Sequence, residues 1–302
     1  MQIVFLGTSG SWPTPRRNVS AIAVKRGPEV VLFDCGEGTQ RQFMQSKLSF
    51  MQVSRIFLSH FHGDHFLGLP GLIQSMNFFG REIPLDVYGP DGAVDLVAKL
   101  LSLGHFKAGY DVRAHDLSPG DRVAADEYSV TAFAAVHTVP GLSFVLEEKA
   151  RPGRFSVEAA TRLGVPQGPL FSRLQVGEAV SVGGSEITPD MVLGPPRPGR
   201  KIVYTGDSMP TEVLVKMARS ADVLIHDATS DAALEEKANQ YGHSSSRQAA
   251  HVAKDADVGL LVLTHVSPRY EDTASVVADA KAVFDRVVLA DDFLEINVPY
   301  RN

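Results

Sequence analysis

The feature that most limits how this chain can fold is a cluster of histidines and one aspartate directly after an apolar segment. Residues 59–65 read Ser-His-Phe-His-Gly-Asp-His, and Arg55–Leu58 before them is a strand candidate. Alternate side chains of an extended chain point the same way, so the first two histidines share one face. The glycine then permits a sharp turn toward the last two donors. Nitrogen and oxygen donors at this spacing are typical of zinc sites. The four donors are His60, His62, Asp64 and His65.

Four donors in one loop are too many for a single ion and fit two neighbouring ions that share further ligands. Such ligands should also follow apolar strands, and three residues do so: His137 after Ser129–Val136, Asp207 after Lys201–Tyr204, and His265 after Gly259–Thr264. Taken singly, each could instead cap a helix or occupy a turn, and the first cluster could be a histidine-rich surface loop. Taken together, they favour a two-metal site at the ends of several strands.

Composition narrows the classes of protein that the chain can belong to. Its 302 residues include a single cysteine, so an internal disulfide and cysteine-rich zinc modules are excluded. Hydrophobic residues make up 44% of the chain, enough to bury a core. The net charge of −6 argues against a general polyanion binder. Binding of nucleic acid would therefore require a local basic patch.

The sequence gives no indication of a membrane protein. No apolar run reaches the roughly 18–20 residues that a membrane helix needs. The N-terminal segment MQIVFLGTSG lacks the basic and apolar regions of a secretory signal. We therefore expect a soluble, cytoplasmic protein.

Short β-branched runs alternate with segments of helical periodicity, and their order predicts two β-rich layers with helices outside. The strand candidates are Ile3–Leu6, Ala21–Val24, Val30–Phe33, Arg55–Leu58, Leu85–Tyr88, Tyr128–Ala134, Leu142–Leu146, Ile202–Thr205, Val223–His226, Gly259–Thr264 and Arg286–Ala290. The helix candidates are Leu69–Phe78, Ala93–Leu103, Thr211–Arg219, Ser245–Ala256 and Thr273–Phe284.

The segment Arg151–Arg200 differs from the rest because it is rich in proline and glycine. It holds one short helix candidate, Ser156–Leu163, followed by the turn-rich Val165–Pro169, and we interpret it as an inserted arm. From Lys149 to Lys201 the chain carries eight basic and four acidic side chains, a local charge of +4. A solvated loop could have this balance, but so could an arm that contacts phosphates.

The complete set of motifs resembles ribonuclease Z of the metallo-β-lactamase superfamily. The His-x-His-x-Asp-His cluster with its three later ligands is similar to the superfamily pattern. Other segments, spread from end to end, narrow the resemblance to the family. These segments are Phe5–Gly10, Pro15–Asn18, Phe33–Gln40, Gly68–Leu72, Val87–Pro90, Gly168–Pro169, Tyr204–Asp207 and Phe293–Pro299.

The resemblance implies an α/β fold, the αββα sandwich of two mixed sheets with a projecting exosite arm. It implies one domain, residues 1–302, in which the arm is inserted at about 150–200. It also implies two Zn²⁺ per chain. His60, His62 and His137 would bind one ion, Asp64, His65 and His265 the other, and Asp207 would bridge them.

The resemblance also assigns catalytic roles. Asp64 would orient the attacking water or take its proton. His243 in the His-Ser-Ser loop would be the general acid, and Asp227 in the His-Asp-Ala-Thr loop would orient it. Asp227 stands where the family usually has Glu, and Ser245 where it has Thr. The shorter carboxylate puts the contact with His243 in question. We expect Asp34 to brace the site, and His226 and Cys35 to be structural.

The implied function is removal of 3′ trailers from tRNA precursors, leaving a 3′-hydroxyl on the tRNA and a 5′-phosphate on the trailer. A homodimer is the expected assembly. The alternatives are another phosphodiesterase or an arylsulfatase-like hydrolase of this fold that acts on a small substrate, and an inactive RNA-binding relative. The residues expected to bind substrate are Arg17, Asn18, Arg154, Arg162, Gly168, Pro169 and Arg173.

Overall fold

The computed structural model describes residues 1–301 and divides them into two compact units. The larger unit consists of residues 1–125, 129–146 and 201–299. The smaller unit consists of residues 126–128 and 147–200 together with Tyr300 and Arg301. Each unit has its own hydrophobic core and is described by itself.

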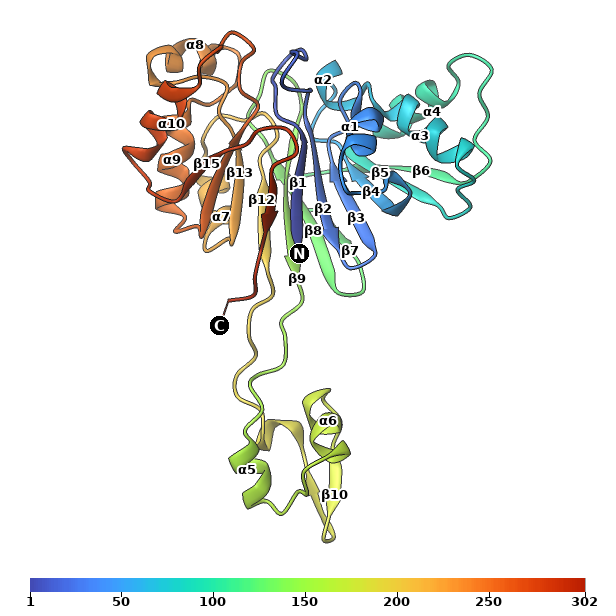
Figure 1. Ribbon diagram of the computed structural model, residues 1–302, viewed down its shortest axis with the longest axis vertical. Coiled ribbons are helices and arrows are strands. Elements are labelled where there is room, and N and C mark those ends of the chain that lie inside the picture. The colour runs from blue at the N-terminus through green and yellow to red at the C-terminus, as the bar shows by residue number, and fades with distance from the viewer. Residues whose placement is uncertain (302) are drawn as a thin grey trace. The chain divides into compact units, whose positions relative to one another are not determined.

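Two seven-stranded sheets form the centre of the larger unit (Figure 1). The first has the order β16(Glu295–Asn297), β1(Gln2–Gly7), β2(Ala21–Arg26), β3(Glu29–Phe33), β4(Val53–Phe57), β5(Leu85–Pro90), β6(Val112–Leu117). The second has the order β15(Val287–Leu289), β14(Leu260–Thr264), β13(Val223–Asp227), β12(Lys201–Tyr204), β9(Leu142–Glu148), β8(Tyr128–Ala134), β7(Arg122–Ala124). Both sheets contain parallel and antiparallel pairs.

The central strands of the sandwich are apolar on both faces because each sheet is covered on both sides there. In β3 the side chains of Val30 and Leu32 belong to the core beneath the outer helices. Phe33, on the opposite face, packs on Phe144 of the other sheet with ring centroids 5.8 Å apart. Phe57 contacts the same ring at 5.4 Å. The alternation of side chains along each strand therefore supplies both cores.

Helices cover the outer face of each sheet. The first sheet packs on α3(Leu69–Phe78) and α4(Ala93–Leu101), with α1(Thr39–Gln45) beside them. The second packs on α7(Glu212–Ala218), α9(Ser246–Asp255) and α10(Ala274–Lys281). The larger unit also contains α2(Gly63–Phe66) and α8(Glu235–Gln240). This confirms the expected sandwich of two mixed sheets with helices outside.

Several elements were not expected from the sequence. β6 is an edge strand, and it carries polar residues at Arg113, His115 and Asp116. These residues interrupt the apolar pattern by which a strand is recognised in the sequence. α1 has only two large apolar side chains in seven residues, too few for a helical pattern. β8 coincides with the strand candidate Tyr128–Ala134, and the strand does not extend to Val136 ahead of His137.

The smaller unit contains α5(Val157–Arg162), α6(Pro169–Gln175) and a hairpin of β10(Val180–Val182) and β11(Ser185–Ile187). Gly183 and Gly184 join the two strands with positive φ values of 58° and 84°, as a tight two-residue turn requires. Its small core includes Ala160, Leu174 and Ile187. The segment Val165–Pro169, expected to be turn-rich, leads directly into α6, a helix that the sequence did not predict.

Among residues 1–301, no helix combines the length and the apolar character needed to cross a bilayer.

Candidate metal centre

The candidate ligands follow the carboxyl ends of strands in both sheets of the larger unit. β4 leads into the loop of His60 and His62, whose next residues form the single turn α2. The neighbouring ends of parallel strands meet at one edge of a sheet, so residues distant in sequence come together there. His137 follows β8, Asp207 follows β12, Asp227 ends β13 and His265 follows β14.

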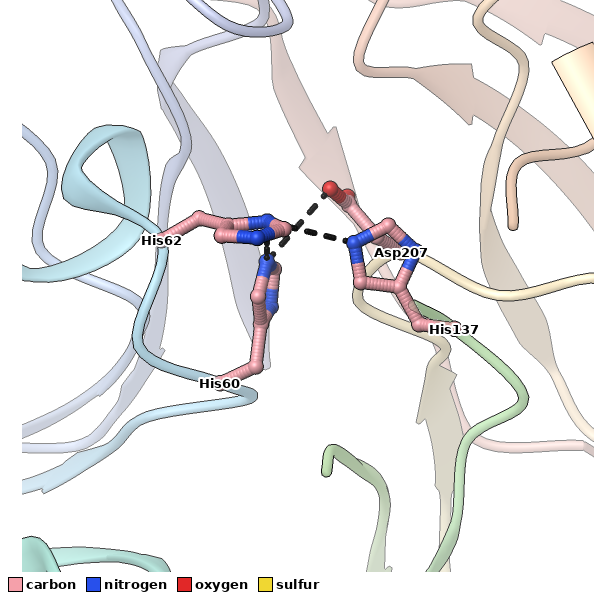
Figure 2. A group of neighbouring side chains, drawn as sticks. All are labelled: His60, His62, His137 and Asp207. Carbon is pink, nitrogen blue, oxygen red and sulfur yellow. Dashed lines mark hydrogen bonds and ion pairs between the residues drawn. The ribbon is translucent and has the colours of Figure 1, made fainter. Parts of the chain in front are cut away.

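His60, His62, His137 and Asp207 form one group, whose donor atoms lie within 4.8 Å of one another. Figure 2 shows the three imidazoles and the carboxylate pointing toward a common centre. His60 Nε2 lies 3.0 Å from His62 Nδ1 and 3.6 Å from Asp207 Oδ2. His137 Nε2 lies 3.2 Å from His62 Nδ1, and the other nitrogen of its ring contacts the carbonyl of Gly242 at 3.0 Å. That second contact fixes the imidazole plane.

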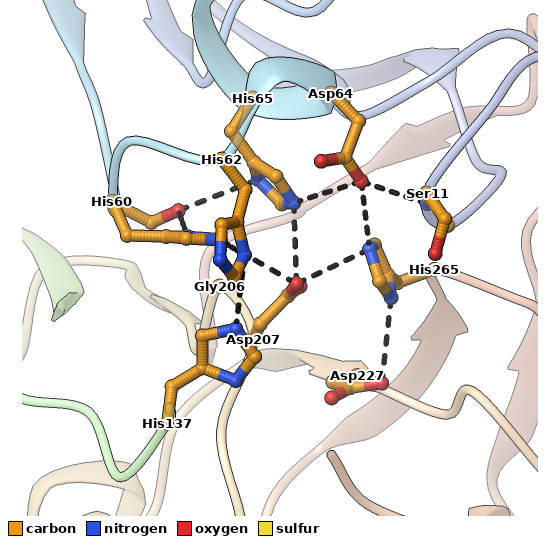
Figure 3. Close-up of polar contacts among 12 residues, drawn as sticks. Ser11, His60, His62, Asp64, His65, His137, Gly206, Asp207, Asp227 and His265 are labelled. Atoms are coloured by element: carbon orange, nitrogen blue, oxygen red, sulfur yellow. Dashed lines mark hydrogen bonds and ion pairs between the residues drawn. The ribbon is translucent and has the colours of Figure 1, made fainter. Parts of the chain in front are cut away.

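Asp64, His65 and His265 form a second group beside the first (Figure 3). Asp64 Oδ2 lies 3.5 Å from His65 Nε2 and 3.4 Å from His265 Nε2. Asp207 Oδ2 lies 3.3 Å from each of those two nitrogens. The same carboxylate oxygen therefore faces both groups, as a bridging ligand would.

The burial and the protonation preferences of these side chains are consistent with metal binding. Asp207 Oδ1 is buried and has no hydrogen-bond partner among residues 1–301, which would be costly without a bound cation. Burial and the neighbouring His65 lower the pKa of His60 well below its ordinary value, which favours the neutral ring that binds metals. Burial alone would lower the pKa of His65, but Asp207 and then Asp34 raise it well above its ordinary value. These carboxylates make the centre favourable for positive charge.

Asp34 supports the cluster from behind. Its side chain is fully buried, and Oδ2 lies 2.7 Å from His65 Nδ1. The hydroxyls of Ser59 and Tyr204 donate hydrogen bonds to the same oxygen, and the Ser59 backbone N–H donates to Oδ1. A carboxylate held by three donors orients the imidazole and leaves Nε2 for the centre. Asp34 therefore braces His65, a candidate ligand, and does not itself join the groups.

His243 and Asp227 are in direct contact despite the shorter carboxylate. His243 Nδ1 lies 3.0 Å from Asp227 Oδ2, and Thr229 donates to Asp227 Oδ1 through its N–H and its hydroxyl. Burial alone would lower the pKa of His243, but Asp227 raises it above its ordinary value. The ring is thus held in one orientation and favoured in its charged form. The cap of α9 is Ser245, whose side chain completes a capping box with Gln248, so His243 does not serve as that cap.

Sequence reasoning missed two contacts at the centre. The backbone N–H of Ser11 donates to Asp64 Oδ2 at 2.7 Å, from a residue with a φ of 61°. The hydroxyl of Thr229 lies 3.0 Å from His265 Nδ1. Thr229 stands in the same four-residue loop as Asp227 and could have been found there. A backbone donor such as Ser11 leaves no signal in the sequence.

Arg17 and Asn18 lie in the loop after β1, and both contact neighbouring parts of the fold. The Arg17 guanidinium pairs with Asp291 and donates to the Thr8 hydroxyl. Asn18 Nδ2 donates to the carbonyl of Glu37 at 2.8 Å. Both residues line a pocket of about 360 Å³. Their binding of substrate stays a prediction.

The other expected substrate residues belong to the smaller unit. Arg154, Arg162, Gly168, Pro169 and Arg173 are all exposed. Gly168 precedes α6 with a φ of 134°, which a side chain would disfavour. Arg173 pairs with Glu178 at 2.8 Å on the surface.

Two residues expected to be structural lie outside the groups. His226 is buried, and its Nδ1 contacts the carbonyl of Asp227 at 2.8 Å. Cys35 is also buried, and burial raises the pKa of its thiol to about 12. A thiol with so high a pKa is not a nucleophile at neutral pH.

The sequence relatives over the full length of the chain are named ribonuclease Z. The chain is 48% identical to a protein named ribonuclease Z from Methanosarcina acetivorans, over all of this chain and 99% of that protein. The model of another family, described as anti-Pycsar protein Apyc1, matches residues 1–147.

Solved structures agree with the sequence relatives. The crystal structure of the short form of human tRNase Z is 30% identical, with a TM-score of 0.74, over 99% of this chain and all of that one. The metallo-β-lactamase fold protein YhfI from Bacillus subtilis has a TM-score of 0.71 at 20% identity, over 98% of each chain, a likeness of fold alone.

Proposed function

The chain belongs to the ribonuclease Z family, and from this we infer that it is the endoribonuclease that removes 3′ trailers from tRNA precursors. The reaction hydrolyses one phosphodiester, leaving a 3′-hydroxyl on the tRNA and a 5′-phosphate on the trailer. The observation that carries this function is the meeting of seven His and Asp side chains at strand ends in a chain related to ribonuclease Z over its whole length.

We propose that the metal is zinc, two ions per chain. His60, His62 and His137 would hold one ion, Asp64, His65 and His265 the other, with Asp207 between them. When bound, two such ions lower the pKa of a water and stabilise charge on the phosphoryl oxygens. The two groups of donors and the oxygen of Asp207 that faces both support this assignment.

The protein's own part in the reaction is to deliver a proton to the leaving group. Asp227 holds Nδ1 of His243, so Nε2 is the nitrogen that can reach the leaving 3′-oxygen. Asp227 raises the pKa of His243 above its ordinary value and so favours the protonated ring. Asp64, fixed by the N–H of Ser11, would orient the attacking water or accept its proton.

The smaller unit is proposed to bind the tRNA body. The positive charge lies in the segment from Lys149 to Lys201, most of which belongs to the smaller unit: the segment carries +4 in a chain of net charge −6. Arg154, Arg162 and Arg173 are exposed and can contact phosphates, and the Gly168-Pro169 turn lies before α6. Arg17 and Asn18 are proposed to contact the substrate near the scissile bond. The proposed assembly is a homodimer in the cytoplasm.

The test is incubation with a tRNA precursor that carries a 3′ trailer, with both product ends mapped. We expect one cut that leaves a 3′-hydroxyl and a 5′-phosphate. Hydrolysis of bis(p-nitrophenyl) phosphate without cleavage of the precursor would instead indicate a hydrolase of small substrates.

A further inference from the structure

His243 lines a pocket of about 410 Å³ that the proposed reaction leaves without an assigned occupant. Three segments of the larger unit form its walls. They are the turn at Ser11–Trp12, the chain from Thr229 to Tyr241 that includes α8, and the turn at Ser267–Tyr270. The volume lies in the range of small-ligand sites.

The lining combines aromatic rings with positive charge. Trp12 and Tyr241 are 50% and 60% exposed, so the faces of both rings are open to a ligand. Tyr270 is held in place, because its hydroxyl accepts a hydrogen bond from the Asp231 N–H at 3.0 Å. Lys237 and Arg269 are exposed on the same lining. Exposed rings beside cations are the features that bind an unpaired base and its phosphate.

Two residues of the pocket wall contact side chains of the metal centre. Thr229 donates to Asp227 at 2.7 Å and lies 3.0 Å from His265 Nδ1. Ser11 donates its N–H to Asp64 at 2.7 Å. A nucleotide in this pocket would therefore have its phosphate next to the candidate ligands.

The chemistry decides which nucleotide this is. Hydrolysis forms a bond from a water oxygen to phosphorus and breaks the bond from phosphorus to the 3′-oxygen, which leaves with the electron pair and takes a proton. His243 supplies that proton, so the nucleoside that carries the 3′-oxygen must lie beside His243. We propose that the pocket binds the last nucleotide of the tRNA, the one on the 5′ side of the cut, with its base against Trp12 and Tyr241. This assignment rests on the proposed function.

A double-mutant cycle between enzyme and substrate tests the assignment. Tyr241→Ala and Trp12→Ala are each assayed in the zinc-loaded enzyme on an intact precursor and on one that lacks the base of the last tRNA nucleotide. Stacking of one base on an aromatic ring contributes about 5- to 150-fold. We expect each variant to lower kcat/KM on the intact precursor by a factor in that range. On the abasic precursor, each variant should have nearly the same kcat/KM as the wild type. Tyr241→Phe keeps the ring, so it should discriminate between the intact and the abasic precursor as the wild type does.

Two controls separate the outcomes. Phe78→Ala, at a ring 80% exposed on α3, should leave both substrates unaffected. A tRNA ending in 4-thiouridine at its last nucleotide should crosslink to Trp12 or Tyr241, a readout that needs no turnover. Equal losses on both precursors, or coupling only to the first trailer base, would overturn the pocket assignment while leaving the function intact. A wild-type enzyme that does not cleave the precursor would overturn the function and the assignment together.

Discussion

Replacing Asp227 by asparagine removes the charge that faces His243 while keeping the size of the side chain. Asp227 is fully buried and accepts from Thr229 twice and from Ser244, besides contacting His243 at 3.0 Å. An asparagine side chain has one oxygen that accepts and one NH₂ group that donates. Its NH₂ group would therefore face either the donors of Thr229 or those of His243 and Ser244. A buried unsatisfied group of this kind costs about 1–3 kcal/mol of stability.

The effect on catalysis follows from the proton that His243 must hold. A general acid contributes about 10²–10⁴-fold to the rate, so His243→Ala should lower kcat on the precursor by that factor. Asp227→Asn should cost less, since the acid remains. Asp227 is the main cause that raises the pKa of His243, ahead of Asp207, so loss of its charge lowers that pKa. The acid therefore loses its proton at lower pH, and the alkaline limb of the kcat profile should move to lower pH.

The assay compares two leaving groups. A precursor releases a basic 3′-oxygen that needs a proton, whereas bis(p-nitrophenyl) phosphate releases an acidic phenolate that leaves without one. Both variants should therefore lose more activity on the precursor. Zinc content and thermal unfolding are measured on the same samples, and zinc content should not change.

Ser245→Ala is the matched control in the same loop. It removes the cap of α9, which stabilises a helix by about 1 kcal/mol, and leaves the pair of His243 and Asp227 in place. It should lower Tm without changing the ratio of the two activities. If His243→Ala behaved like Ser245→Ala, with parallel losses on both substrates, His243 would not be the acid.

Three further outcomes follow from the same geometry. Elemental analysis should find about two zinc ions per chain, and His65→Ala should lose at least one of them with nearly all activity; one ion or none in the metal-replete wild type would refute the paired site. Gly242→Ala should lower zinc content, because a Cβ there would lie 2.8 Å from His137 Nδ1 at a backbone φ of 73°; unchanged zinc and activity would show that the loop adjusts. Arg154→Ala with Arg162→Ala should raise KM for the precursor but not for bis(p-nitrophenyl) phosphate, and should reduce the salt dependence of binding; equal effects on both substrates would count against the smaller unit as a tRNA-binding surface.

The sequence by itself identified the strands that matter most. The run Val30–Phe33 is apolar throughout, and Arg55–Leu58 is apolar after its arginine, which is the pattern of strands covered on both faces. Elements with mixed or few apolar residues, such as β6 and α1, were missed because edge positions and short helices need little periodicity.

At the site, the sequence predicted the donors of residues 60–65 because local spacing fixes side-chain directions within one loop. The meeting of His137, Asp207 and His265 with them depends on the order of strands in two packed sheets, which no local pattern encodes. The contact of Asp227 with His243 was in question from side-chain length alone. The contact forms because the backbone at the end of β13 and in the loop before α9 brings the two residues close enough for the shorter side chain of aspartate to reach His243. The aromatic pocket beside His243 likewise gathers residues 12, 241 and 270, which only tertiary packing brings together.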